Sequence, residues 1–253
     1  NFDRMVVGAV LGPAAAGVYS VATSVGLRLS IITGQVTEVL VPYASRKNSQ
    51  NEHQELYKTF QYSSRIVSLV IGVLASILIV WMSTILSLWI SPEYAQKHSQ
   101  AFCVIVIAYT TISISRIGHQ TLTGMGKVKM AALIYLLSSF LMLTGVYLLS
   151  TQWGLLGAAY ANLFMMALLS FNLIIYKYFS PQNFMKSAIT DLTVALFMPV
   201  AVYGLSLLLA TTMFSKILLV VFIFIFAFFY AKKSNTLIFL KTMTINQAQM
   251  RKL

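Results

Sequence analysis

Long apolar segments separated by short turns run through the whole chain and leave few folds open to it. The stretch 217–226, for example, is apolar all round, which is typical of a helix with no water-facing side. A bilayer core about 30 Å thick requires about 20 such residues per helical crossing. Only 9% of the 253 residues are charged and the mean hydropathy is +0.79, too apolar a balance for a soluble domain. We therefore predict an all-α integral membrane protein.

Seven full transmembrane helices are expected, preceded by one truncated helix at the start of the chain. The full segments are 14–43, 66–90, 101–123, 128–149, 155–179, 189–214 and 217–231, with Gly and Pro turns between them. They predict a polytopic helical bundle in which residues 1–253 form a single transmembrane lobe. Because the chain opens on Asn1 with only about half a span before the first turn, we expect a fragment without its N-terminal lobe.

Lysine and arginine are distributed unevenly between alternate loops, and this asymmetry predicts the orientation. One side receives Arg46, Lys47, Lys58, Arg65, Lys127, Lys129, Lys177, Lys186, Lys232, Lys233, Lys241, Arg251 and Lys252, and the other receives Lys97 and Lys216. The positive-inside rule places the first side in the cytoplasm. We therefore expect a cytoplasmic amphipathic loop at 44–65, lying along the membrane face, and a basic cytoplasmic tail at 232–253. The basic cytoplasmic loops then account for the net charge of +12, and we expect no nucleic acid as a partner.

Two of the expected helices carry an arginine within a polar stripe. At about 100° per residue, each set spans about 80° of its helix: Ser20, Ser24, Arg28, Gln35 and Glu38 in the first full helix, and Tyr109, Ser113, Arg116, Gln120 and Thr123 in the third. A charge at the centre of a spanning helix costs about 2.5–3.5 kcal/mol, so such residues usually face a cavity or a partner. Guanidinium binds phosphate through paired hydrogen bonds and stays charged when desolvated. We predict an anion-binding substrate cavity lined by Arg28, Arg116, Gln35 and Gln120.

Several of these residues also have a structural interpretation. Arg28 and Glu38 can belong to a polar network between helices. Arg116 can extend to the cytoplasmic headgroups, and His119, which flanks it, can be a packed or interfacial histidine. Asp3, next to an arginine in the truncated helix, can have its partners outside this sequence.

Motifs for enzyme chemistry are absent from the sequence. The three histidines, His53, His98 and His119, lack the spacing of metal ligands. The chain has neither a glycine-rich phosphate loop nor a Ser-His-Asp set. We expect no metal, no cofactor and no catalytic residues, and therefore a protein that is not an enzyme.

The opening of the chain resembles that of a transporter family. The stretches that carry the resemblance are FDRMVVG at 2–8, LGP at 11–13, GVYS at 17–20, VPYASR at 41–46, LTGMGK at 122–127 and WGLLGAA at 153–159. They are similar to the polysaccharide/O-antigen flippase (Wzx-type) family of the MOP exporter superfamily, most clearly in residues 1–46. The resemblance implies the C-terminal lobe of a MOP-type transporter.

The resemblance also implies a function in the bacterial inner membrane. Family members are thought to flip undecaprenyl-pyrophosphate-linked oligosaccharide, the repeat unit of O-antigen or capsular polysaccharide, by alternating access. The expected partners are this lipid-linked substrate, membrane lipids and other polysaccharide assembly proteins. Family topology also places the C-terminus in the cytoplasm. Glu38, Asp3 and His119 are the candidates for ion coupling, because they are the titratable residues near the two stripes.

Two alternatives stay open, one within transport and one from a different class. A MATE-type multidrug/cation antiporter would favour acidic cavity residues, whereas the two stripes carry two arginines and one glutamate. A membrane-embedded glycan polymerase or acyltransferase would need a catalytic set in a sizeable periplasmic loop. The expected periplasmic loops have about ten residues or fewer, which argues against such an enzyme.

Overall fold

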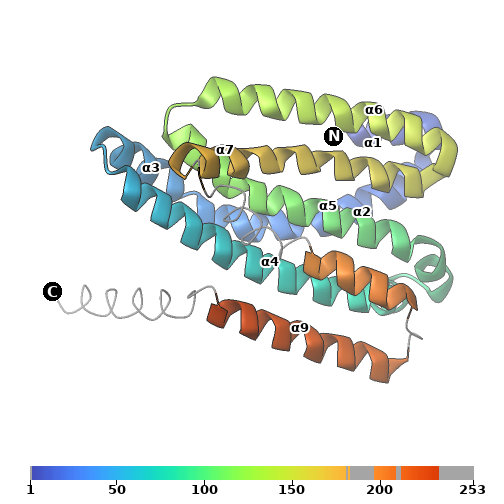
Figure 1. Cartoon of the computed structure of the whole chain (residues 1–253). Helices are drawn as coiled ribbons and strands as arrows, with labels where there is room; N and C mark the ends of the chain where they lie inside the picture. Colours follow the sequence, from blue (N-terminus) through green and yellow to red (C-terminus); the bar gives the residue numbers. More distant parts are fainter. Residues whose placement is uncertain (1, 181, 183–196, 209–211, 234–253) are drawn as a thin grey trace.

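The computed structural model describes residues 2–180, 182, 197–208 and 212–233, except the side chains of Gln35, Val36 and Lys233. The helices of this part are α1 (Phe2–Leu11), α2 (Pro13–Thr37), α3 (Leu40–Ser49), α4 (His53–Trp89), α5 (Pro92–Gly124), α6 (Val128–Ala161), η1 (Asn162–Leu169), α7 (Ser170–Phe179), a short helix over Phe197–Leu208, and α9 (Met213–Lys233). The long helices run side by side as a bundle (Figure 1). This architecture fits the predicted integral membrane helical bundle.

Within the described residues, five helices are long and apolar enough to cross a membrane: Pro13–Gly34, His53–Trp89, Pro92–Gly124, Val128–Phe179 and Met213–Lys232. The fourth of them contains two of the expected segments, 128–149 and 155–179. Its backbone turns at Trp153 and Gly154, which have non-helical angles (φ −121°, ψ 16° and φ 58°, ψ −139°). Of the expected segment 189–214, residues 197–208 form a short helix, and the other described residues, 212–214, lie at the start of α9. These spans support a multi-pass membrane protein, and the number of seven stays a prediction.

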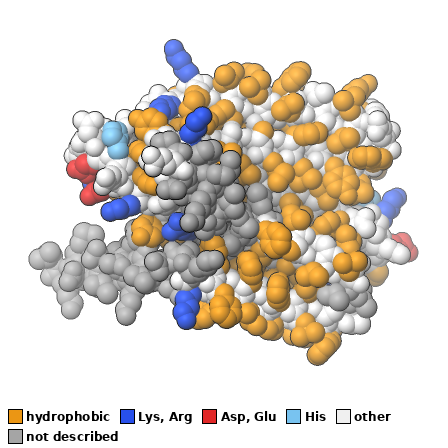
Figure 2. All heavy atoms as spheres, viewed as in Figure 1, with side chains coloured by type: hydrophobic (Ala, Val, Ile, Leu, Met, Phe, Trp, Pro, Cys, Tyr) orange, Lys and Arg blue, Asp and Glu red, His pale blue; other side chains and the backbone are white. Residues whose placement is uncertain are grey.

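Helix α5 forms the centre of the bundle, because it packs against α2, α3, α4, α6, η1 and α7. Its side chains Phe102, Ile105 and Ile117 are fully buried. The peripheral helix α6 instead exposes large apolar side chains such as Leu136 and Phe140. A wide band of such side chains covers the face shown in Figure 2. An apolar outer surface is expected of helices that face lipid.

The 44–65 segment differs from the expected surface loop. Helix α3 ends at Ser49, a turn with Asn51 at φ 58° follows, and α4 then runs without a break from His53 to Trp89. Its first turns bury Leu56 and Phe60, which belong to the same core cluster as residues of α5 and α7. Leu56 and Phe60, two apolar positions of this segment, therefore pack inside the bundle. That the segment lies along the cytoplasmic face of the membrane stays a prediction.

Cationic side chains gather at one end of the bundle (Figure 2). Helix α3, the start of α4, the turn between α5 and α6 and the final turns of α7 and α9 all lie at this end (Figure 1). Its described cations are therefore Arg46, Lys47, Lys58, Lys127, Lys129, Lys177 and Lys232. Arg65, expected on the same side, lies within α4, more than three turns past its start. Lys97, near the start of α5, and Lys216, near the start of α9, belong to the opposite end. The arrangement matches the two sides derived from the loops. Which side faces the cytoplasm stays a prediction, and residues 234–253 of the basic tail lie outside the described residues.

Candidate functional site

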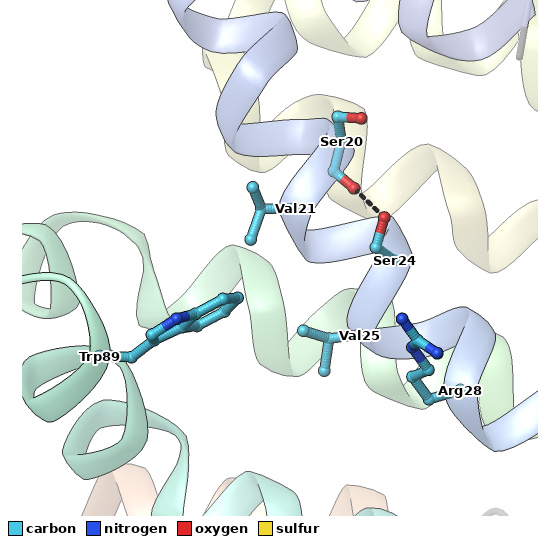
Figure 3. A pocket seen from close by; sticks show the side chains of 6 residues that line it. All are labelled: Ser20, Val21, Ser24, Val25, Arg28 and Trp89. Carbon is cyan, nitrogen blue, oxygen red and sulfur yellow. Dashed lines mark hydrogen bonds between the residues drawn. The ribbon is translucent and has the colours of Figure 1, made fainter.

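The polar stripe of α2 lines an open pocket between α2 and the end of α4. Arg28, Ser20 and Ser24 form its polar wall, and Val21, Val25 and Trp89 complete it, around a volume of about 250 Å³ (Figure 3). The Ser24 hydroxyl donates to the Ser20 carbonyl oxygen at 2.7 Å, a bond within the helix.

Arg28 and Trp89 give this pocket its chemical character. Both side chains are exposed, so neither is enclosed in the core. Arg28 supplies a permanent positive charge with several N–H donors, and Trp89 supplies an aromatic surface with one donor of its own. A few polar groups within a mostly apolar wall are typical of ligand sites. The pocket can therefore accept a ligand that has both an anionic and an apolar part.

Arg116 lies in different surroundings, at the contact between α5 and α2. Its Nη1 donates to the carbonyl oxygen of Ser30 at 2.9 Å. The hydroxyls of Ser30 and Ser113 are also hydrogen-bonded, at 3.1 Å. A Cβ on Gly34 would lie 3.3 Å from Nη1, so the glycine lets the guanidinium approach the helix backbone. The structure thus brings both arginines to α2, but Arg116 does not belong to the residues that line the Arg28 pocket.

The other predicted site residues are spread along the same two helices. Gln120 and His119 are half-buried on α5, and the His119 ring packs against Tyr135 of α6, with ring centroids 4.9 Å apart. Glu38 is exposed at the C-terminal cap of α2. Gln35 belongs to α2, but its side chain lies outside the described residues.

Asp3 and Arg4 have partners within this chain, in contrast to the expectation that these lie elsewhere. The Tyr19 hydroxyl donates to Asp3 Oδ2 at 3.1 Å and accepts from Asn162 Nδ2 at 2.9 Å. Arg4 Nη2 donates to the Thr23 hydroxyl at 3.1 Å. Tyr19 and Asn162 are buried, so this polar network joins α1, α2 and η1 inside the bundle.

Three residues of this network, Tyr19, Thr23 and Asn162, are not among the site residues predicted from the sequence. A signal was available for Asn162, because an amide within an apolar spanning segment requires a hydrogen-bond partner. Tyr19 and Thr23 are four residues apart and so lie on one face of α2. In the part of the chain that the structure describes, no group of three His, Cys, Asp or Glu is placed to hold a metal ion.

Comparisons with known proteins cover part of the chain. Residues 1–94 match the family model described as "Polysaccharide biosynthesis protein". A 158-residue stretch is 24% identical to a Shigella flexneri protein named "Putative O-antigen transporter". Both matches support the polysaccharide/O-antigen flippase family. The resemblance to flippases is thereby confirmed, and that the chain is a transporter and not an enzyme stays a prediction. No solved structure matches the chain significantly.

The match to the Shigella transporter has a limited extent. It takes in 62% of this chain and 37% of the relative's length. Together with the apolar helices, the similarity supports a multi-pass membrane protein. That this chain is the C-terminal lobe of a flippase stays a prediction.

Proposed function

We propose that this chain forms one lobe of a flippase of the bacterial inner membrane, with its C-terminus in the cytoplasm. Its substrate would be an undecaprenyl-pyrophosphate-linked oligosaccharide, carried across the bilayer by alternating access. The matched family and the O-antigen transporter of Shigella support this class of cargo. Membrane lipids and other polysaccharide assembly proteins would be its further partners.

The observation that carries the proposal is the Arg28 pocket. A pyrophosphate and sugar hydroxyls cannot cross hydrocarbon without groups that replace their lost water contacts. Arg28 supplies a charged donor of the type that binds phosphate oxygens, and Ser20 and Ser24 place further polar atoms on the same wall. Trp89 offers the less polar surface that a sugar ring or the start of a prenyl chain would contact.

Arg116 and its neighbours would extend this polar surface along α2 and α5. One N–H of Arg116 bonds to the Ser30 carbonyl, and a guanidinium has five N–H donors in all. It therefore keeps donors for an anion while it holds the two helices together. Gln35 and Gln120 would add hydrogen bonds to sugar hydroxyls as the cargo moves along the stripe.

Of the three candidates for ion coupling, Asp3 has the surroundings that best suit the role. Its carboxylate accepts the Tyr19 hydroxyl, which in turn accepts from Asn162. Protonation of Asp3 would weaken this acceptor and so change the contact of α1 with α2. Glu38 is exposed and His119 packs on an aromatic ring. Protonation of either residue would therefore change helix packing less than protonation of Asp3.

Complementation tests the proposed class of cargo. The full-length gene is expressed in a strain that lacks its own polysaccharide flippase, and surface polysaccharide and the cytoplasmic pool of lipid-linked repeat units are measured. We expect restored surface polymer and a smaller pool. Failure to restore polymer, with gained drug resistance in the same cells, would contradict the proposal in favour of an antiporter.

A further inference from the structure

A buried amide of α7 hydrogen-bonds to the backbone of one turn of α5. Asn172 is fully buried; its Oδ1 accepts from the Gly118 N–H at 3.0 Å and its Nδ2 donates to the Ile114 carbonyl oxygen at 3.3 Å. In a regular α-helix this N–H and this carbonyl are partners of each other, four residues apart. One carboxamide thus hydrogen-bonds to both members of a single backbone pair, and α5 stays α-helical through this turn.

The fit between Asn172 and α5 depends on Gly118. A Cβ at position 118 would lie 2.2 Å from Asn172 Oδ1, 2.7 Å from its backbone nitrogen and 2.8 Å from the Phe171 carbonyl carbon. No larger side chain can therefore occupy this position while α7 keeps its place. The tight contact fixes the Ile114–Gly118 turn of α5 relative to α7.

Arg116 lies within the Ile114–Gly118 turn, and its side chain reaches α2. Its guanidinium donates to the Ser30 carbonyl and approaches the backbone at Gly34. The Ser113 hydroxyl, in the turn before it, bonds to the Ser30 hydroxyl. A continuous set of polar contacts thus runs from α7 through α5 to α2, the helix that lines the Arg28 pocket.

We propose that Asn172 is a positioning residue, whose carboxamide anchors the Ile114–Gly118 turn of α5 to α7 and so directs Arg116 onto α2. Without the amide, this turn of α5 shifts relative to α7 and Arg116 moves with it. Arg116 then meets α2 at a different place or not at all. The consequence for cargo rests on the proposed function, whereas the positioning of Arg116 does not.

Disulfide formation between α2 and α5 tests this proposal in membranes. Ser30→Cys and Ser113→Cys are introduced together with Cys103→Ala, and the rate of oxidation is measured. The Ser30 and Ser113 hydroxyl oxygens are 3.1 Å apart, so the two thiols are expected to react quickly. The Arg116 bond to the backbone of residue 30 survives both substitutions.

Asn172→Ala is expected to slow this oxidation about fivefold or more, because it removes two buried hydrogen bonds. Thr121→Val is the matched control, since its hydroxyl bonds to the Ile117 carbonyl of its own helix, and it should leave the rate unchanged. Gly118→Ala should slow oxidation as Asn172→Ala does. The double variant should be no slower than the slower single variant, because both changes break one contact.

Three results would overturn the positioning role: an unchanged rate in Asn172→Ala, an equal loss in the Thr121→Val control, or fully additive losses in the double variant. Polysaccharide transport is measured in parallel in the same strains. Loss of disulfide formation in cells whose parent protein transports no polysaccharide would leave the positioning role standing and reject the proposed function. Normal transport in Asn172→Ala with slowed oxidation would confine the role of Asn172 to helix packing.

Discussion

Three glycines of α2 provide a graded test of its packing against α5. A Cβ on Gly17 would meet nothing within 4 Å, whereas one on Gly34 would meet the flexible end of Arg116 at 3.3 Å. A Cβ on Gly26 would lie 2.6 Å from two ring carbons of Tyr109 and 3.0 Å from the Tyr109 Cβ. The methyl group added by Gly→Ala would therefore enter open space at Gly17, contact a movable side-chain end at Gly34, and contact the fixed base of a side chain at Gly26.

The expected free energies follow from these distances. Each Gly→Ala change gains about 1 kcal/mol of helix propensity, and Gly17→Ala should show most of this gain. Gly34→Ala should be close to neutral, because Arg116 can shift by a few tenths of an ångström. Gly26→Ala adds an overpacking cost of about 1–3 kcal/mol, toward the upper end because the root of the Tyr109 side chain is also in contact. Its net loss should be about 1–2 kcal/mol.

Thermal unfolding of the purified protein in detergent measures this series. At about 2–4 °C per kcal/mol for a chain of this size, Gly26→Ala should unfold roughly 4–12 °C below Gly17→Ala, with Gly34→Ala between them. Equal midpoints for Gly17→Ala and Gly26→Ala would refute the packing of α2 on α5, and with it the placement of Arg116.

Three further predictions concern topology, the backbone break within α6 and the buried network. Cysteines at Ser49 and Ser99 should react with membrane-impermeant reagents from the cytoplasm and from the periplasm, respectively, and the reverse pattern would overturn the orientation. Gly154→Ala should lower stability by about 1–3 kcal/mol from backbone strain at φ 58°, although a Cβ there meets no neighbour; a midpoint at or above that of the parent would contradict this. Tyr19→Phe should cost about 1–2 kcal/mol, because the Asp3 carboxylate loses its hydroxyl donor, and a neutral result would show that the bond contributes nothing.

Features set by neighbouring residues could be predicted from the sequence. Pro13 and Pro92 mark the starts of α2 and α5, because proline suits the first turn of a helix. The Ser91 side chain accepts from the Tyr94 N–H at 3.1 Å and caps α5. The break at Gly154 falls at the predicted turn. In each case the residues that decide the structure lie within a few positions of one another.

Features set by distant contacts could not be predicted in the same way. Asn162 bonds to Tyr19 across 143 positions, and Asn172 bonds to Gly118 across 54. An amide in an apolar segment indicates that a partner exists, but helix packing decides which residue it is. The first turns of α4 are a similar case, since apolar residues such as Leu56 suit a membrane surface or a bundle core equally well. In this structure Leu56 belongs to the bundle core, because it packs in one cluster with residues of α5 and α7.

In the proposed function, the Arg28 face of α2 binds the anionic part of a lipid-linked oligosaccharide. The most direct measurement is the cytoplasmic pool of lipid-linked repeat units in the complemented flippase-deficient strain, at matched protein levels. Arg28→Ala should raise this pool and lower surface polysaccharide, and Arg28→Lys should restore part of the transport because it keeps the charge and loses the paired donors. Arg46→Ala, an exposed arginine of α3 outside the pocket, should leave the pool unchanged. A pool in Arg28→Ala equal to that of the parent protein would contradict the claim.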